Sequence, residues 1–252
     1  MSAADDELEA LALELAKMYQ EIWEAKKLPK NINKPVTQFF AEKLWKGAEA
    51  GLAIEYEVPD SNLIANLQKN VYQFAGAKNY QQMKAITEAL VDNGKRREFA
   101  AFKEAALNIT SDHMGWLKTE YNTAVAGGQM ASKWVDIQNK KEILPYLQFD
   151  AVMDGQTTEL CAGLNKVTLP VDDPFWNTYY PPNHFNCRST VRQLRSGAVT
   201  DLNEIEYPEI PAMFQTNLAK ENLIFPKNSA YFKDVPKSVL KESVSLIPKK
   251  EK

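Results

Sequence analysis

The sequence predicts an α+β protein, with a helical N-terminal two-thirds, a small and mostly antiparallel β module, and an irregular C-terminal tail. Apolar residues recur at helical spacing through the first two-thirds. Short runs of strand-forming residues follow from about Ile143, and after about Ser196 Pro is scattered and periodicity is lost. We therefore expect a helical region over 1–108, a β-containing module over 109–195 and an extended, Lys-rich tail over 196–252.

The first predicted helix has acidic residues near its start, where they suit the helix dipole, and an apolar stripe with steps of three and four. The stripe consists of Leu8, Leu11, Leu15, Met18 and Ile22. Two interpretations stay open. The helix packs within its own domain, or it packs against another subunit or partner.

Further helices are predicted from caps and breaks. Two Pro residues bracket a polar break at 28–35, and Thr37 is the expected N-cap of the second helix. Val58-Pro59-Asp60-Ser61 separates it from the third, Asn79 begins a fourth, and Gly94 is the expected C′ residue of that helix.

Three more helices are expected around Phe102, Tyr121 and Trp134, with Gly127-Gly128 ending the second of these. His113 is expected near the start of a helix.

The predicted strands lie at 144–153, 166–171 and 187–194, and Asp154-Gly155 forms a turn pair after the first. The segment 172–186 between the last two is rich in aromatic residues and Pro. We expect it to be an ordered loop packed over the core, without regular helix.

Composition excludes several classes of protein. The net charge of −3 and pI of about 5.6 exclude a protein that is basic as a whole and binds nucleic acid in that way. No stretch approaches the roughly 20 apolar residues of a membrane span, and MSAADDELEA lacks the features of a signal peptide. Two Cys residues are too few for a disulfide scaffold, so we expect reduced thiols and folding in a cytosol.

Chemistry-bearing residues gather in three late segments, 154–163, 172–176 and 180–191. Pro181-Pro182 stiffens the approach to a turn that can direct His184 and Cys187 toward one place. Asn186 can bond backbone groups of that turn. The Arg188 guanidinium requires a carboxylate such as Asp154 as a bidentate partner.

Cys161, His184 and Cys187 are ligands of the type that zinc prefers. A closed structural site needs four ligands, however, and neither Thr158 nor Ser189 is a usual one. A metal-free cluster of buried thiols beside a hydrogen-bonded His is the second interpretation, and a Cys/His nucleophile pair is the third. The sequence contains no G-x-x-x-x-G-K-[ST], H-E-x-x-H or G-x-S-x-G motif.

The run YPPNHFNCRSTVRQL resembles the closing signature of the phage Mu F-like minor head protein family, also called the phage head morphogenesis domain. That signature runs P-P-x-H-x-N-C-R-C-x-V. The matching residues are Pro181, Pro182, His184, Asn186, Cys187, Arg188 and Val191, with Ser189 in place of the second Cys. Upstream, an approximate fit is given by Asp154, Thr157, Cys161, Gly163 and Leu164. The resemblance covers about 99–194.

The resemblance implies a minor head protein of a tailed bacteriophage, without enzymatic activity, whose motif residues are structural. It implies the portal protein and the major capsid protein as partners, several copies in the virion head at the portal vertex, and assembly in the host cytoplasm. No cofactor is implied, and a zinc ion with Cys161, His184 and Cys187 as ligands stays a candidate.

Two alternative functions stay open. One is a related toxin or enzyme that uses Cys161, His184 and Cys187. The other is a DNA-binding accessory protein that acts through residues 226–252. This segment contains seven Lys and three acidic residues, which give it a net charge of +4.

Overall fold

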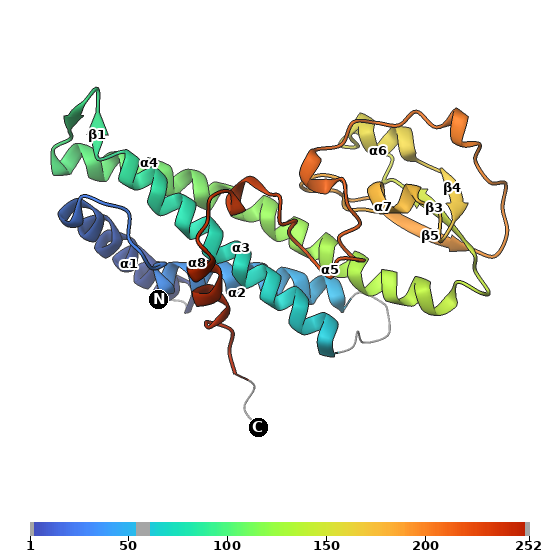
Figure 1. Cartoon of the computed structure of the whole chain (residues 1–252), viewed down its shortest axis with the longest axis horizontal. Coiled ribbons are helices and arrows are strands. Elements are labelled where there is room, and N and C mark those ends of the chain that lie inside the picture. The colour runs from blue at the N-terminus through green and yellow to red at the C-terminus, as the bar shows by residue number, and fades with distance from the viewer. Residues whose placement is uncertain (1–2, 54–60, 250–252) are drawn as a thin grey trace. The chain divides into compact units, whose positions relative to one another are not determined.

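The structure is a computed structural model that describes residues 3–53 and 61–249. Helices dominate the first two-thirds, and the later part carries a three-stranded antiparallel sheet (Figure 1). The predicted α+β class is therefore confirmed. The chain divides into two compact units, which are described separately. They are Met1–Trp45 with Gln68–Lys118 and Ala230–Lys252, and Lys46–Leu67 with Thr119–Ser229.

The first unit is built from helices. Its elements are α1 (Ala3–Ala25), most of α2 (Lys34–Leu52) and α3 (Ser61–Glu88), the hairpin β1 (Val91–Asp92) and β2 (Lys95–Arg96), α4 (Phe99–Gly115) and α8 (Lys237–Val244). One apolar cluster joins α1, α3 and α4, and includes Met18, Ile22, Met83, Ile86 and Phe102. The C-terminal half of the α1 stripe thus packs within its own unit, whereas Leu8 is 52% exposed.

Two predicted helix starts in this unit are wrong. The α2 helix begins at Lys34, and the side chain of Asn33 accepts a hydrogen bond from the Val36 N–H at 3.0 Å, while Thr37 is fully buried. The α3 helix continues through Asn79, whose side chain accepts from the Asn33 N–H at 2.9 Å. Tertiary hydrogen bonding thus places a cap-forming residue type inside a helix.

Two further predictions in this unit are also wrong. Gly94 (φ 75°) follows Asn93 (φ 48°) in the β1–β2 turn, where both residues have the left-handed conformation of an Asn-Gly hairpin. His113 lies in the last turn of α4, and it is buried. Val58, Pro59 and Asp60 lie outside the described residues.

The second unit packs helix α5 (Leu117–Lys140) and two short helices around a sheet of order β4-β3-β5. The remaining elements are β3 (Tyr146–Asp150), α6 (Glu159–Leu164), β4 (Thr168–Pro170), α7 (Phe175–Thr178) and β5 (Thr190–Leu194). Both strand pairs are antiparallel, with Leu147 opposite Leu169 and Gln193. Each of the three strands lies within a predicted range, and Leu147, Phe149, Leu169 and Val191 enter the core.

Helix α5 runs through Gly127-Gly128, so the prediction that these glycines end a helix is wrong. They are required for close packing. A Cβ on Gly127 would lie 3.1 Å from Ile224, and one on Gly128 would overlap the backbone of Ala48.

The segment 172–186 is ordered over the core, as predicted, but it also contains the one-turn helix α7, which was not predicted. Trp176 is fully buried, and its indole N–H donates to the Pro170 carbonyl at 2.9 Å. After Ser196 the chain forms 3₁₀ turns and then α8. Among the described residues, no helix combines the length and apolar character needed to cross a membrane.

Candidate functional site

The Arg188 guanidinium and the Asp154 carboxylate form the bidentate ion pair that the sequence predicts. Arg188 Nη1 and Nη2 donate to the two Asp154 oxygens at 2.7 and 2.6 Å. These bonds, followed by one from the Gln156 N–H, hold the pKa of Asp154 well below its usual range. Both side chains are more than two-fifths exposed. The pair thus joins the turn after β3 to the segment that leads into β5.

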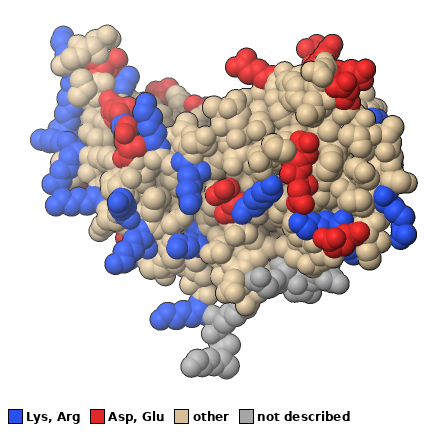
Figure 2. Space-filling view, turned by 45° about the vertical axis from the view of Figure 1, so that its right-hand side comes forward, with Lys and Arg blue, Asp and Glu red and all other residues tan. Residues whose placement is uncertain are grey.

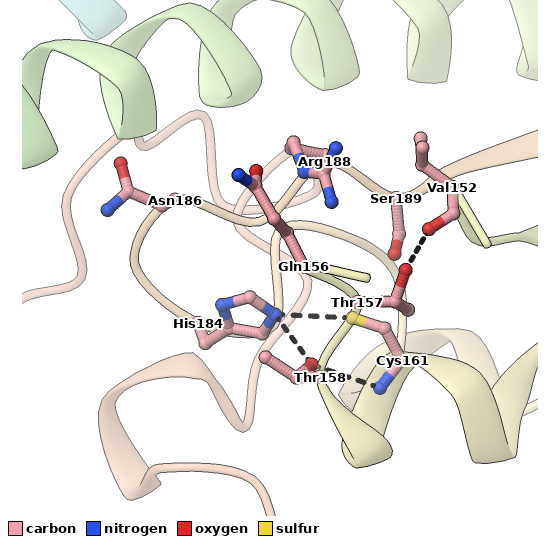
Figure 3. Close-up of a pocket in the computed structure, with 9 residues that line it drawn as sticks. All are labelled: Val152, Gln156, Thr157, Thr158, Cys161, His184, Asn186, Arg188 and Ser189. Atoms are coloured by element: carbon pink, nitrogen blue, oxygen red, sulfur yellow. Dashed lines mark hydrogen bonds between the residues drawn. The ribbon is translucent and has the colours of Figure 1, made fainter. Parts of the chain in front are cut away.

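The Asp154 turn has its own internal support from Thr157. The Thr157 hydroxyl accepts from the Asp154 N–H at 2.9 Å and donates to the Val152 carbonyl (Figure 3). The Asp154 carboxylate also accepts from the Gln156 N–H at 2.9 Å. The turn therefore presents the carboxylate to Arg188 in a preformed orientation.

Asn186 links the segment that precedes β5 to helix α5. It has a left-handed backbone, with φ of 59°. Its N–H donates to the Thr123 hydroxyl at 3.2 Å, its side-chain amide donates to the Thr119 hydroxyl at 3.2 Å, and its side-chain oxygen accepts from Asn122 at 3.0 Å. The sequence predicts bonds to the turn itself, whereas the structure directs the side chain to a helix.

Pro181 and Pro182 are buried and joined by a cis peptide bond. The preceding residue, Tyr180, is fully buried and donates its hydroxyl to the Met130 carbonyl of α5 at 3.0 Å. Its ring meets Trp134 edge-on, with centroids 4.8 Å apart. The start of the motif is therefore held in the core by an aromatic contact with α5.

Cys161, His184 and Cys187 converge, and we call them the Cys-His cluster. His184 Nε2 lies 3.2 Å from Cys161 Sγ, and the two sulfurs are 3.9 Å apart. All three donor atoms lie within 4.8 Å of one another. Cys161 sits on α6, whose N-cap Thr158 accepts from the Cys161 N–H at 3.3 Å.

The orientation of the His184 ring follows from its contacts. Nδ1 lies 2.7 Å from the Phe185 carbonyl oxygen, which can only accept, so Nδ1 carries the proton. Nε2 therefore turns its lone pair toward Cys161 Sγ and Thr158 Oγ1 (Figure 3). The contact with Cys161 is also the main cause that raises the pKa of His184.

The two thiols have opposite pKa shifts. The contact with Cys161 is the main cause that lowers the pKa of Cys187 to about 6. The same contact, together with burial, raises the pKa of Cys161 to about 12. The cluster can thus hold a thiolate beside a thiol and a basic imidazole, an arrangement suited to a soft metal ion or to nucleophilic chemistry.

A small cavity of about 20 Å³ opens beside the cluster. Its lining consists of Val152, Gln156, Thr157, Thr158, Cys161, His184, Asn186, Arg188 and Ser189 (Figure 3). Gly163 lies outside this group, exposed on α6, and a Cβ added to it would have nothing within 4 Å. The sequence analysis missed the roles of Thr119 and Thr123. Their spacing of four residues places them on one face of α5, which was the available signal.

Comparisons with known proteins agree with this motif. Residues 81–192 match the family described as Phage Mu protein F like protein. The chain is 38% identical over 86 residues to "Putative capsid assembly protein F" of Escherichia phage Mu, covering 34% of this chain and 20% of that protein. It is 32% identical over 83 residues to "Mu-like prophage FluMu F protein" of Haemophilus influenzae strain Rd, covering 33% of this chain and 19% of that protein.

These matches span about a fifth of the length of either relative. No solved structure matches the chain significantly. The matched range contains the Asp154–Arg188 pair, Asn186 and the whole Cys-His cluster. Residues 81–192 of the chain thus match the family of phage Mu protein F-like proteins.

Proposed function

We propose that the chain acts in assembly of the head of a tailed bacteriophage, as a minor head protein that binds the portal vertex. The family match over residues 81–192 carries this proposal, together with a relative named as a capsid assembly protein. The major capsid protein is a further partner. The proposed location is the virion head at the portal vertex, after assembly in the host cytoplasm.

The contacts of the motif support a structural role. Asp154 and Arg188 bond each other, Asn186 bonds three residues of α5, and Tyr180 bonds the α5 backbone. These four residues thus connect segments of one unit. A folded module of this kind can present a defined surface to a partner without performing a reaction.

Co-purification tests the portal contact. The full chain would be co-expressed with the portal protein of its own phage, and with an unrelated portal protein as a specificity control. We expect co-purification with the cognate portal over a series of salt concentrations. Failure to co-purify with the cognate portal at any salt concentration would contradict portal binding.

DNA binding is the second candidate, and one observation favours it. A hollow of about 400 Å³ between α3 and α8 is lined by Lys69, Lys237 and Lys241. On the face in Figure 2, basic and acidic side chains both occur, and large areas carry neither. Contacts of these lysines with phosphates would weaken steeply with salt. Retention on DNA that ignores salt, or that survives replacement of all three lysines by Gln, would exclude this candidate.

The 3.2 Å contact between Cys161 and His184 is the observation that favours an enzyme or toxin. That function predicts growth arrest on expression, relieved by Cys187→Ala in a variant that still folds. Normal growth of cells that express the soluble wild-type chain would argue against it.

A further inference from the structure

The Cys-His cluster has nearly the spacing of a tetrahedral metal site. Zinc lies about 2.3 Å from thiolate sulfur and about 2.0 Å from imidazole nitrogen, so tetrahedral ligands stand about 3.8 Å apart for two sulfurs and about 3.5 Å for sulfur and nitrogen. The two sulfurs are 3.9 Å apart, and Cys161 Sγ lies 3.2 Å from His184 Nε2. The longest edge is within 4.8 Å, so a small closing movement would complete the geometry.

The His184 ring is already oriented as a ligand. Its Nδ1–H group donates to the Phe185 carbonyl, which leaves the Nε2 lone pair directed at the cluster. A backbone carbonyl on the second ring nitrogen is the usual support of a metal-binding His, because it fixes the tautomer and raises the basicity of the ligand.

Charge and space also fit a divalent cation. Two thiolates and a neutral imidazole would neutralise Zn²⁺, which avoids a net charge at a site where Cys161 and Cys187 are 3% and 4% exposed. The cavity of about 20 Å³ beside Cys161 and His184 is large enough for one water molecule.

We propose that Cys161 Sγ, Cys187 Sγ and His184 Nε2 bind one Zn²⁺ ion, with a water molecule in the fourth position. Each thiol gives its proton to solvent when the ion binds. The ion would join α6 to the segment that precedes β5, which the Asp154–Arg188 pair joins to the turn after β3. This proposal is independent of the portal contact.

The first experiment measures metal content. The full chain would be purified without a polyhistidine tag, under reducing conditions and without chelators, and its zinc measured by elemental mass spectrometry. We expect one zinc per chain. We expect the variants Cys161→Ser, Cys187→Ser and His184→Gln to lose it, whereas Gly163→Ala, on the exposed surface of α6, keeps it.

The second experiment needs no variant. Zinc would be removed from the wild-type chain by chelation, and Co²⁺ would be titrated into it. We expect a visible spectrum of tetrahedral Co²⁺ with thiolate-to-cobalt charge transfer, saturating at one equivalent and abolished by added Zn²⁺. Because the wild-type chain is used, this result does not depend on whether any variant folds.

A substitution that should strengthen binding completes the test. Ser189 lines the cavity beside Cys161 and His184 in which the water would lie. Ser189→Cys would replace the water with a third thiolate and close the site. We expect this variant to hold zinc against a chelator concentration at least tenfold higher than the wild type withstands.

Three results would overturn the proposal. One is a wild-type chain that takes up neither stoichiometric zinc nor Co²⁺ with thiolate charge transfer. Another is zinc that stays at one per chain in folded variants lacking any one of the three ligands. The third is a Cys161–Cys187 disulfide in the chain purified under reducing conditions.

Discussion

Gly128 on α5 offers a sharp test of the packing, because a helix interior normally disfavours glycine. A Cβ added there would overlap the Ala48 carbonyl oxygen and lie 3.1 and 3.2 Å from its carbonyl carbon and Cα. All three atoms belong to the backbone, so no side-chain rotation relieves the overlap. Gly128→Ala therefore requires the contact between α5 and the end of α2 to open.

The size of the effect follows from two opposing contributions. Alanine stabilises a helix interior by about 1 kcal/mol relative to glycine. Overpacking a tight contact costs typically about 1–3 kcal/mol, and an immobile backbone places this site at the upper end. We expect a net loss of about 2 kcal/mol, which corresponds to a melting temperature lower by about 4–8 °C for a chain of this size.

Thermal unfolding followed by circular dichroism measures this effect in the full chain. The matched control is Gly163→Ala, a helical position with nothing within 4 Å of the added Cβ. We expect this variant to melt at or slightly above the wild-type temperature. If Gly128→Ala melts as late as the wild type, the close approach of α5 to Ala48 is wrong.

Three further predictions concern single side chains. Burial, and then the charge of Lys78, lowers the pKa of His113 to about 4, so the unfolded chain binds a proton that the folded chain does not as the pH falls from 6.5 to 4. Stability should decrease over that window by at most about 3 kcal/mol, and denaturant titrations should show a smaller decrease in His113→Phe; equal pH dependence in both would contradict this assignment. Asn186→Val should destabilise by about 1–2 kcal/mol, because a β-branched residue is strained at φ of 59°, whereas Asn186→Gly should cost less; similar melting of the two variants would show that the backbone conformation is not the cause. Arg188→Gln should lower the melting temperature more at low than at high salt, because its ion pair with Asp154 is exposed; a deficit that does not change with salt would count against the ion pair.

Local patterns predicted the α+β class and the positions of the three strands, because the strand-forming residues of these runs also supply the core of the sheet. The predicted helix boundaries were wrong where tertiary contacts override local preference. Asn79 and Gly128 are examples: one is used for a hydrogen bond to Asn33, and the other for a backbone contact with Ala48. The prediction for Gly94 was wrong for a different reason, since the Asn93-Gly94 hairpin signal was interpreted as a helix end.

The candidate site was predicted in part. Chemistry alone paired Arg188 with a carboxylate, and the structure confirms Asp154 as that partner. The convergence of Cys161 with His184 and Cys187 spans 26 residues of sequence, and only the fold could establish it. The bonds from Asn186 to α5 cross more than 60 residues, and no local pattern encodes such a distance.

The proposed role in head assembly is tested most directly by quantitative mass spectrometry of particles from the phage that encodes this chain. The chain would be counted against the portal and major capsid proteins in DNA-filled particles and in procapsids. A minor head protein at the portal vertex predicts a few to a few tens of copies per particle, close to the number of portal subunits. Absence of the chain from both kinds of particle would contradict the proposal.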